Sequence, residues 1–196
     1  MRIAELRPGL HRWTTPHPDA EPNPKPGSPA DWAPDVGSVA YEAEEALLLV
    51  DPLVPEDGWA SLDGLVERHD RPVMLFVTLP FHRRSREAVT KRYDATETLP
   101  PGVETIAIEG AGETMVWLPG PHALISGDRI LGDDAGGLRL CPQSWLGYLQ
   151  NGMTRAQLAE ELRPLLDLPI QLVLVSHGEP VLDGGREALA LAIDSA

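Results

Sequence analysis

Polar residues that could do chemistry follow three apolar runs of this 196-residue sequence. Asp51 follows LLLV, Asp128 follows ALISG, and His177 follows LVLVS. A fourth apolar run, Val73 to Leu79, leads into a turn that carries the histidine and the arginines of the stretch FHRRSR. If these runs are strands of one layered structure, their polar ends meet at one edge, where α/β folds commonly place their sites. We therefore predict that the site is built from these four strand ends.

The turn after Leu79 is unusual because Arg83, Arg84 and Arg86 crowd the predicted start of a helix. The positive end of the helix dipole makes arginine locally unfavourable there, by up to about 1 kcal/mol per residue at exposed positions. Three explanations stay open. The side chains extend into solvent, or they pair with the protein's own carboxylates, or they join the free helix amides in binding a phosphate or carboxylate ligand.

The elements that must position these residues alternate in type along the chain. Continuous or alternating apolar runs predict strands at Val36 to Tyr41, Glu44 to Val50, Val73 to Leu79, Val103 to Ile108, Thr114 to Leu118, Ala123 to Ser126 and Gln171 to Val175. Helical spacing predicts helices at Asp57 to His69, Ser85 to Tyr93, from Thr154 with a capping box, and at Gly185 to Ile193. This order, with a meander of short strands in the middle, is typical of a layered α/β protein.

Composition restricts the class of protein. A net charge of −14 argues against sequence-independent binding to nucleic acid, which depends on lysine and arginine. The apolar runs are much shorter than the roughly 20 residues of a membrane-spanning helix, and no charged-then-apolar leader begins the sequence. The single cysteine, Cys141, cannot form an internal disulfide. We predict one cytoplasmic domain over residues 1–196 that binds neither nucleic acid nor membrane. The sequence gives no indication of the oligomeric state.

Residues 16–34 hold seven prolines and little that could pack. This composition predicts an extended surface loop. Long irregular loops within compact domains are uncommon and often act as lids, so a lid is the alternative. Trp13 and Trp32 bracket the segment, and we expect them to pin it to the body of the protein.

Four stretches, LLLVDPL, VMLFVT, HALISGD and LVLVSHGEPVLDGGREAL, resemble in order the metallo-β-lactamase fold superfamily, over roughly Val36 to Ile193. The most specific pieces are ISGD at 125–128 and SHGEP at 176–180. They stand where that superfamily has a metal-binding aspartate and a terminal metal-binding histidine. The resemblance implies a four-layer αββα sandwich, with the site at one edge between the two sheets.

The sequence departs from the superfamily at its histidine-rich loop. The ligand positions of that loop are occupied by Leu79, Phe81, Arg83 and Arg84. Guanidinium offers no lone pair to a metal and repels a cation. A further family histidine is absent from IEGAGE at 108–113. Only Asp128 and His177 remain, whereas a catalytic metal usually takes three protein ligands.

The sequence therefore predicts a protein of this fold that holds no metal or other cofactor, is not a conventional metallo-hydrolase, and binds a small anionic ligand in the former metal site. The candidate catalytic residues are Asp128, His177 and His82, and the candidate ligand-binding residues are Arg83, Arg84 and Arg86. The first alternative is a hydrolase with one zinc or other divalent ion on His82, Asp128 and His177. The second is a protein-interaction module that uses the proline-rich loop and the acidic surface.

Purely structural roles stand beside these functional ones. Asp128 follows a glycine, and its carboxylate could accept the backbone amides of its own turn. His177 could serve only to hold the loop before Gly178. We expect Asp51 to orient neighbouring backbone rather than to react.

Overall fold

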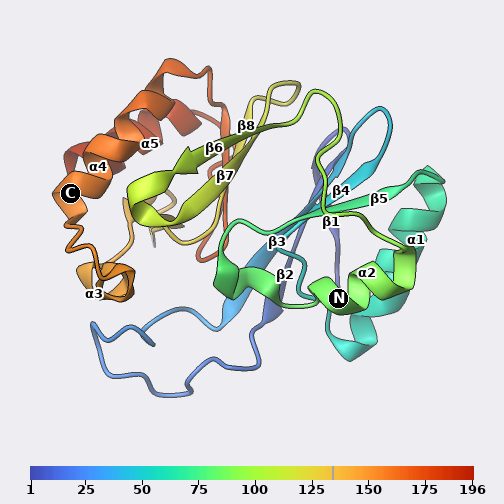
Figure 1. The fold of residues 1–196 in the computed structure, drawn as a ribbon, viewed down its shortest axis with the longest axis horizontal. Helices are drawn as coiled ribbons and strands as arrows, with labels where there is room; N and C mark the ends of the chain where they lie inside the picture. Colours follow the sequence, from blue (N-terminus) through green and yellow to red (C-terminus); the bar gives the residue numbers. More distant parts are fainter. Residues whose placement is uncertain (134) are drawn as a thin grey trace.

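Two β-sheets lie face to face at the centre of the molecule, and helices cover their outer faces (Figure 1). The computed structural model describes residues 1–133 and 135–196. The first sheet has the order β1-β2-β3-β4-β5 and is formed by β1 (Ala4–Arg7), β2 (Leu10–Pro16), β3 (Asp35–Glu42), β4 (Leu47–Val50) and β5 (Val73–Phe76). Neighbouring strands are antiparallel except β4 and β5, which are parallel.

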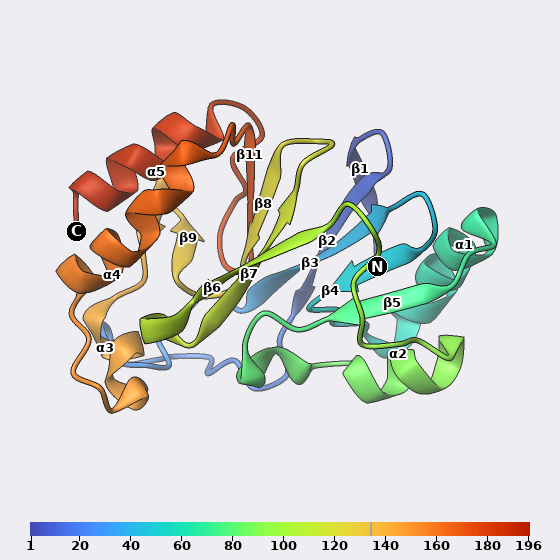
Figure 2. The same ribbon diagram turned by 45° about the horizontal axis from the view of Figure 1, so that its top comes forward.

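The second sheet has the order β11-β8-β7-β6 (Figure 2). Its strands are β6 (Glu104–Ile108), β7 (Glu113–Leu118), β8 (Ala123–Ser126) and β11 (Leu172–Val175). β11 joins β8 in parallel, whereas β6, β7 and β8 form the antiparallel meander that the turns predicted. A two-stranded ribbon of β9 (Ile130–Gly132) and β10 (Leu138–Leu140) follows β8.

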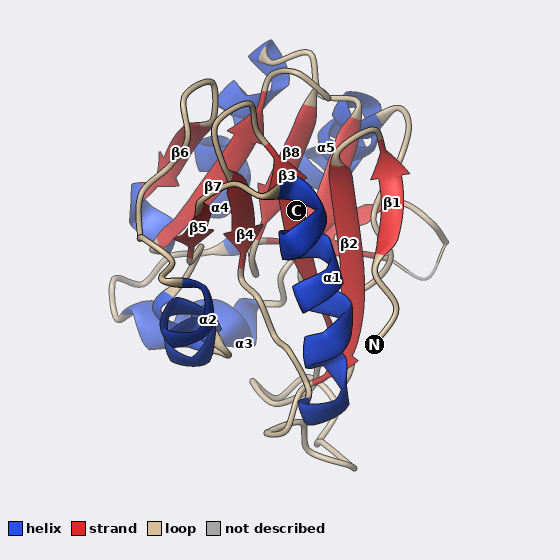
Figure 3. Ribbon diagram, turned by 90° about the vertical axis from the view of Figure 1, so that its right-hand side faces the viewer, coloured by secondary structure: helices blue, strands red, loops and turns tan. Residues whose placement is uncertain are grey.

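Helices α1 (Trp59–His69) and α2 (Arg86–Tyr93) pack against the outer face of the first sheet, as Figure 3 shows from that side. Helices α4 (Arg155–Leu162) and α5 (Gly185–Asp194) pack with the short α3 (Gln143–Leu146) against the second sheet. Three apolar clusters fill the spaces between successive layers, which confirms the predicted αββα sandwich. In the described part of the chain, no helix is both long and apolar enough to cross a bilayer.

Every strand and helix expected from the sequence has a counterpart, with shifted boundaries. The predicted strand Val73 to Leu79 ends at Phe76, because the chain leaves the sheet there and turns toward the site. The capping box on α4 is confirmed, with Thr154 and Gln157 bonded to each other's backbone amides. Strands β1 and β2 were not predicted. In β2 the buried residues include His11 and Arg12, which hide the apolar pattern.

The proline-rich segment runs irregularly over the surface between β2 and β3 and is mostly exposed (Figure 1). Trp13 is buried at its start and donates its indole N–H to the Leu53 carbonyl at 2.9 Å. Trp32, near the end of the segment, packs against the apolar cluster between the second sheet and its helices. Both tryptophans therefore hold the segment, as expected. The predicted surface turn at Asp133 and Asp134 is described only in part, since Asp134 lies outside the described residues.

Candidate functional site

Asp51 fixes the start of the site at the end of β4. The residue has a left-handed backbone with φ 48°, and its carboxylate turns toward the loop after β5. Its Oδ1 accepts the Thr78 amide at 2.8 Å, and its Oδ2 accepts the Thr78 hydroxyl. Asp51 is buried, and its Oδ2 also faces His82. The carboxylate therefore positions both the backbone and the histidine of this loop, in the orienting role expected from the sequence.

His82 lies between two carboxylates. Its Nδ1 is 2.8 Å from Asp51 Oδ2, and its Nε2 is 3.0 Å from Asp128 Oδ1. Burial alone would lower the pKa of His82, but the charges of Asp128 and Asp51 outweigh it and raise the pKa to about 9. At neutral pH the ring is thus an imidazolium that donates one N–H to each carboxylate.

Asp128 and His177 complete the cluster. Asp128 Oδ1 is also 3.4 Å from His177 Nε2, so two imidazoles face the same oxygen. Burial opposes the charge of Asp128, yet His82 and His177 hold the pKa of this carboxyl well below its ordinary value. The structure thus brings together His82, Asp128 and His177 from three separate loops, after β5, β8 and β11. The carboxylate faces side chains rather than its own backbone turn.

The three arginines of the turn diverge. Arg84 points inward, and its guanidinium donates to the carbonyls of Gly37 at 2.8 Å and Asp51 at 2.9 Å and to the Ser176 hydroxyl. Arg83 is exposed, and Arg86 pairs with a surface carboxylate, Glu97, at 2.5 Å. Of these three arginines, only Arg84 therefore lines the cavity beside Asp128. Arg84 has φ 39°, so the backbone is strained where this side chain turns inward.

Glu113 fixes the backbone of the turn that carries Asp128. Its buried carboxylate accepts the Ser126 hydroxyl at 2.9 Å and three successive backbone amides at 2.8–3.0 Å, from Gly127, Asp128 and Arg129. The role of Glu113 was not predicted from the sequence, where residues 108–113 stood out only for a missing histidine. The available signal was an acidic residue between a glycine-rich turn and an apolar strand.

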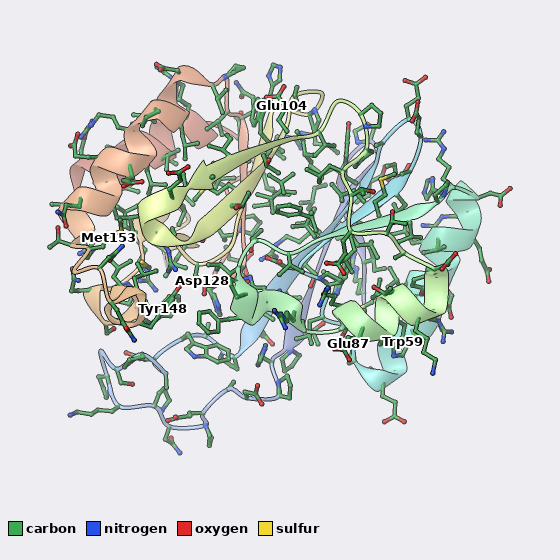
Figure 4. All side chains as sticks on the ribbon, viewed as in Figure 1. Trp59, Glu87, Glu104, Asp128, Tyr148 and Met153 are labelled. Carbon is green, nitrogen blue, oxygen red and sulfur yellow. The ribbon has the colours of Figure 1, made fainter. Side chains whose placement is uncertain are left out.

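A cavity of about 490 Å³ opens beside Asp128 and His82. Aromatic rings form much of its wall. Trp32, from the proline-rich segment, lies edge-on to His177 at 5.3 Å between ring centroids, and Trp145 lies at 5.4 Å from the same ring. Phe81 and Tyr148 pack edge-to-face at 5.0 Å and are 62% and 43% exposed. Figure 4 shows Tyr148 and Asp128 on the side of the molecule where the proline-rich segment passes.

Arg129 is a fully buried cation in the wall of this cavity. Its Nε donates to the Ala111 carbonyl at 2.9 Å, its Nη2 bonds to the Tyr148 hydroxyl, and the guanidinium lies 5.4 Å from the Tyr148 ring. Its Nη1 is buried without a hydrogen-bond partner among the described residues. Sequence reasoning missed Arg129, although an arginine between the ISGD stretch and an apolar strand was a visible signal.

Solved structures resemble this arrangement over almost the whole chain. Each alignment below covers 99% of this chain. VMB-1 is covered to 97%, with a TM-score of 0.66 and 12% sequence identity, and FIM-1 from Pseudomonas aeruginosa in its mono-zinc form to 95%, with a TM-score of 0.61 and 11% identity. A metallo-β-lactamase from Erythrobacter litoralis is covered to 92%, with a TM-score of 0.59 and 13% identity. The chain has the metallo-β-lactamase fold. No family model and no curated protein matches the sequence.

The side chains present do not fit two metal ions of the metallo-β-lactamase fold. Leu79 is buried and apolar, Phe81 lies at the cavity mouth, and Arg84 places a guanidinium among the carboxylates. One ion is the most that the donors could hold, since the donor atoms of His82, Asp128 and His177 lie within 4.8 Å of one another. His82, however, directs both ring nitrogens at carboxylates.

Proposed function

We propose that this metallo-β-lactamase-fold protein uses the cavity beside Asp128 to bind a small molecule with an apolar body and an anionic group. We further propose that it does so without a resident metal ion and is not a conventional metallo-hydrolase. One observation carries the proposal: the acidic side chains around His82 are already matched by the protein's own cations. Asp51 and Asp128 contact His82 at 2.8 and 3.0 Å, and the Arg84 guanidinium lies near both.

Charge balance disfavours a divalent cation here. A metal ion bound to His82 would first have to displace the proton that Asp51 and Asp128 stabilise. It would then lie near the Arg84 guanidinium, which interacts with the same two carboxylates. Like charges in a buried site repel strongly because little water screens them. The site is therefore already neutralised by its own side chains.

The aromatic wall favours a ligand with an apolar or planar body. Of the three exposed large hydrophobic side chains of the described residues, two, Phe81 and Tyr148, stand together at this mouth. Exposed apolar groups gathered at a cavity are typical of ligand-binding sites. Trp32 and Trp145 extend the apolar surface inward to His177.

Arg129 supplies a place for the anionic group. A buried guanidinium N–H without a partner is costly, and such a group in a cavity wall is typical of a site that an absent ligand completes. Arginine binds carboxylate and phosphate with two parallel hydrogen bonds, and it keeps its charge in a low-dielectric environment. We expect a carboxylate or phosphate of the ligand to accept from Nη1.

Thermal shift measurements with matched ligands test this function. Aryl carboxylates and aryl phosphates should raise Tm, whereas the neutral methyl esters of the same acids should not. Arg129→Gln should abolish the rise and Phe81→Ala should reduce it. Arg83→Gln and Arg86→Gln, which remove charges outside this cavity, are the matched controls and should retain it. Equal shifts with acids and esters, or loss of the rise only in the two controls, would refute the assignment.

A mononuclear metal site is the second candidate, because Asp51 holds His82 Nδ1 as a carboxylate holds a metal-binding histidine. FIM-1, a neighbour in fold, was solved in a mono-zinc form. Here His82, Asp128 and His177 would hold the ion, which would supply Lewis acidity and an activated water. Zinc bound at one equivalent and lost in His177→Ala would favour this candidate over the metal-free one.

A further inference from the structure

A second group of metal-binding side chain types lies outside the candidate site. His11 comes from β2, Glu42 ends β3, and His69 ends α1. His69 Nε2 is 2.8 Å from Glu42 Oε1, and His11 Nε2 bonds to the same oxygen. The donor atoms of all three lie within 4.8 Å of one another. We propose that His11, Glu42 and His69 bind a divalent transition-metal ion such as Zn²⁺.

The pleat of the first sheet brings these residues together. His11 pairs with Ala40 across β2 and β3, and Glu42 is two residues beyond Ala40, so His11 and Glu42 project from the same face. That face also carries α1, whose last residue is His69. Three elements that are distant in the sequence therefore contribute one donor each, which is typical of a site that joins parts of a fold.

The donor types fit a transition-metal ion. Both Nε2 atoms face Glu42 Oε1, as two imidazoles face Asp128 Oδ1 in the candidate site, so this convergence alone does not distinguish the two clusters. Two imidazole nitrogens and one carboxylate oxygen are a donor set that zinc takes in proteins, with a fourth position left open. Calcium and magnesium prefer oxygen ligands and should bind poorly.

The surroundings favour a cation at this position. In the described part of the chain, no lysine or arginine hydrogen-bonds or pairs with Glu42. His69 lies in the last turn of α1, where the helix dipole attracts positive charge. The side chains of His11, Glu42 and His69 are 8%, 21% and 20% exposed, so an ion can enter from solvent.

This site is independent of the proposed function. His11 is the second residue of β2, and His17, which lines the cavity, directly follows the strand. At about 3.3 Å per residue, roughly 20 Å of chain therefore separates the cluster from the cavity. Failure of one assignment therefore leaves the other standing.

Zinc titration of the untagged, chelator-treated full-length chain tests the proposal. We use the His177→Ala background, which removes the other histidine cluster as a source of binding. Isothermal titration should give one equivalent of Zn²⁺ there, with a Zn²⁺-dependent rise in Tm, and His69→Ala added to it should lose both. Glu42→Gln should also lose the tight binding, whereas His122→Asn, which removes an imidazole outside both clusters, should retain it.

Cobalt gives a second readout that does not depend on stability. Co²⁺ in the His177→Ala background should give the intense visible absorption of four-coordinate cobalt, and His69→Ala should abolish it. Unchanged stoichiometry and affinity in His69→Ala would overturn the proposal. So would a chain that takes up no Zn²⁺ in the His177→Ala background while its circular dichroism is unchanged.

Discussion

The described residues contain two clusters of two histidines and one carboxylate, and the surroundings of the two clusters differ. We call His82, Asp128 and His177 the inner cluster and His11, Glu42 and His69 the outer cluster. The inner cluster is shielded by the aromatic cavity and lies beside further cations. The outer cluster lies where β2 begins and β3 and α1 end, without such cations in hydrogen-bonding contact. Our two proposals therefore assign the same donor types to a self-neutralised ligand site in one place and to a metal site in the other.

Removing Asp51, the carboxylate that holds His82 from outside the inner cluster, should have the largest effect on stability. Asp51→Ala takes the partner from the buried imidazolium of His82 and from the Thr78 amide. We expect a loss of about 3–5 kcal/mol in the free energy of unfolding, as for one partner of a buried ion pair. Urea denaturation measures this loss. A cost below about 1 kcal/mol would show that His82 is not held as an imidazolium.

The pH dependence of stability should come from the inner cluster. The pKa of His82 is about 9 in the folded chain and near 6.5 when unfolded, so its contribution is complete below about pH 6.5 and disappears as the pH rises through 9. The pKa values of Asp51 and Asp128 are lowered, so their contribution disappears as the pH falls below about 4.

Urea denaturation from pH 5 to pH 10 checks this dependence. The wild type should lose a few kcal/mol relative to His82→Gln between pH 6.5 and 9.5, at about 1.36 kcal/mol per pKa unit. His69→Gln is the matched control from the outer cluster and should keep the wild-type slope. A constant difference between wild type and His82→Gln across this range would contradict the assigned protonation.

Removing a cation should make the inner cluster resemble the outer one. Arg84→Asn removes the guanidinium near Asp51 and Asp128 and leaves a shorter neutral side chain on a backbone (φ 39°, ψ −117°) that disfavours any residue except glycine. We expect a loss of about 1–3 kcal/mol in stability, because buried acceptors lose their donor. We also expect Zn²⁺ binding to appear in the Arg84→Asn, His69→Ala double variant. Equilibrium dialysis of that variant beside His69→Ala measures the gain, and equal metal contents would count against charge balance.

The smallest effect should come from the outer carboxylate without metal. Glu42 is about one-fifth exposed, so Glu42→Gln in chelator-treated protein should cost no more than about 1 kcal/mol. With saturating Zn²⁺ the difference from wild type should grow, since only the wild type gains binding energy. A cost that is independent of Zn²⁺ would place the cluster among ordinary hydrogen-bonded groups.

The sequence predicted the layers and the strand ends well, because apolar periodicity and turn residues are local signals. Asp51, Asp128 and His177 follow continuous apolar runs, and all three meet at one edge as predicted. The direction of each arginine was not predictable. Arg84 turns inward because its backbone has φ 39° and because the Gly37 carbonyl, distant in the sequence, accepts from its guanidinium. Neither feature leaves a local signal in the sequence.

Residues that approach from distant elements were also missed. Trp32 and Trp145 reach His177 from a loop and a short helix that no local pattern connects with it. Trp32 gives the proline-rich segment a place in the cavity wall, and the lid alternative for this segment stays a prediction. The interaction-module hypothesis for residues 16–34 stays a prediction. Arg129 and Glu113 were overlooked because their partners, the Tyr148 hydroxyl and the backbone amides of the Asp128 turn, leave no periodic pattern in the sequence.

The metal content of His69→Ala tests the central claim most directly, since this variant leaves the inner cluster as the remaining histidine cluster of the described residues. After dialysis against excess Zn²⁺ and removal of free ion, elemental analysis should find much less than one equivalent bound, because His82 and Arg84 already neutralise the inner carboxylates. One equivalent of tightly held zinc, lost when His177→Ala is added, would contradict the account.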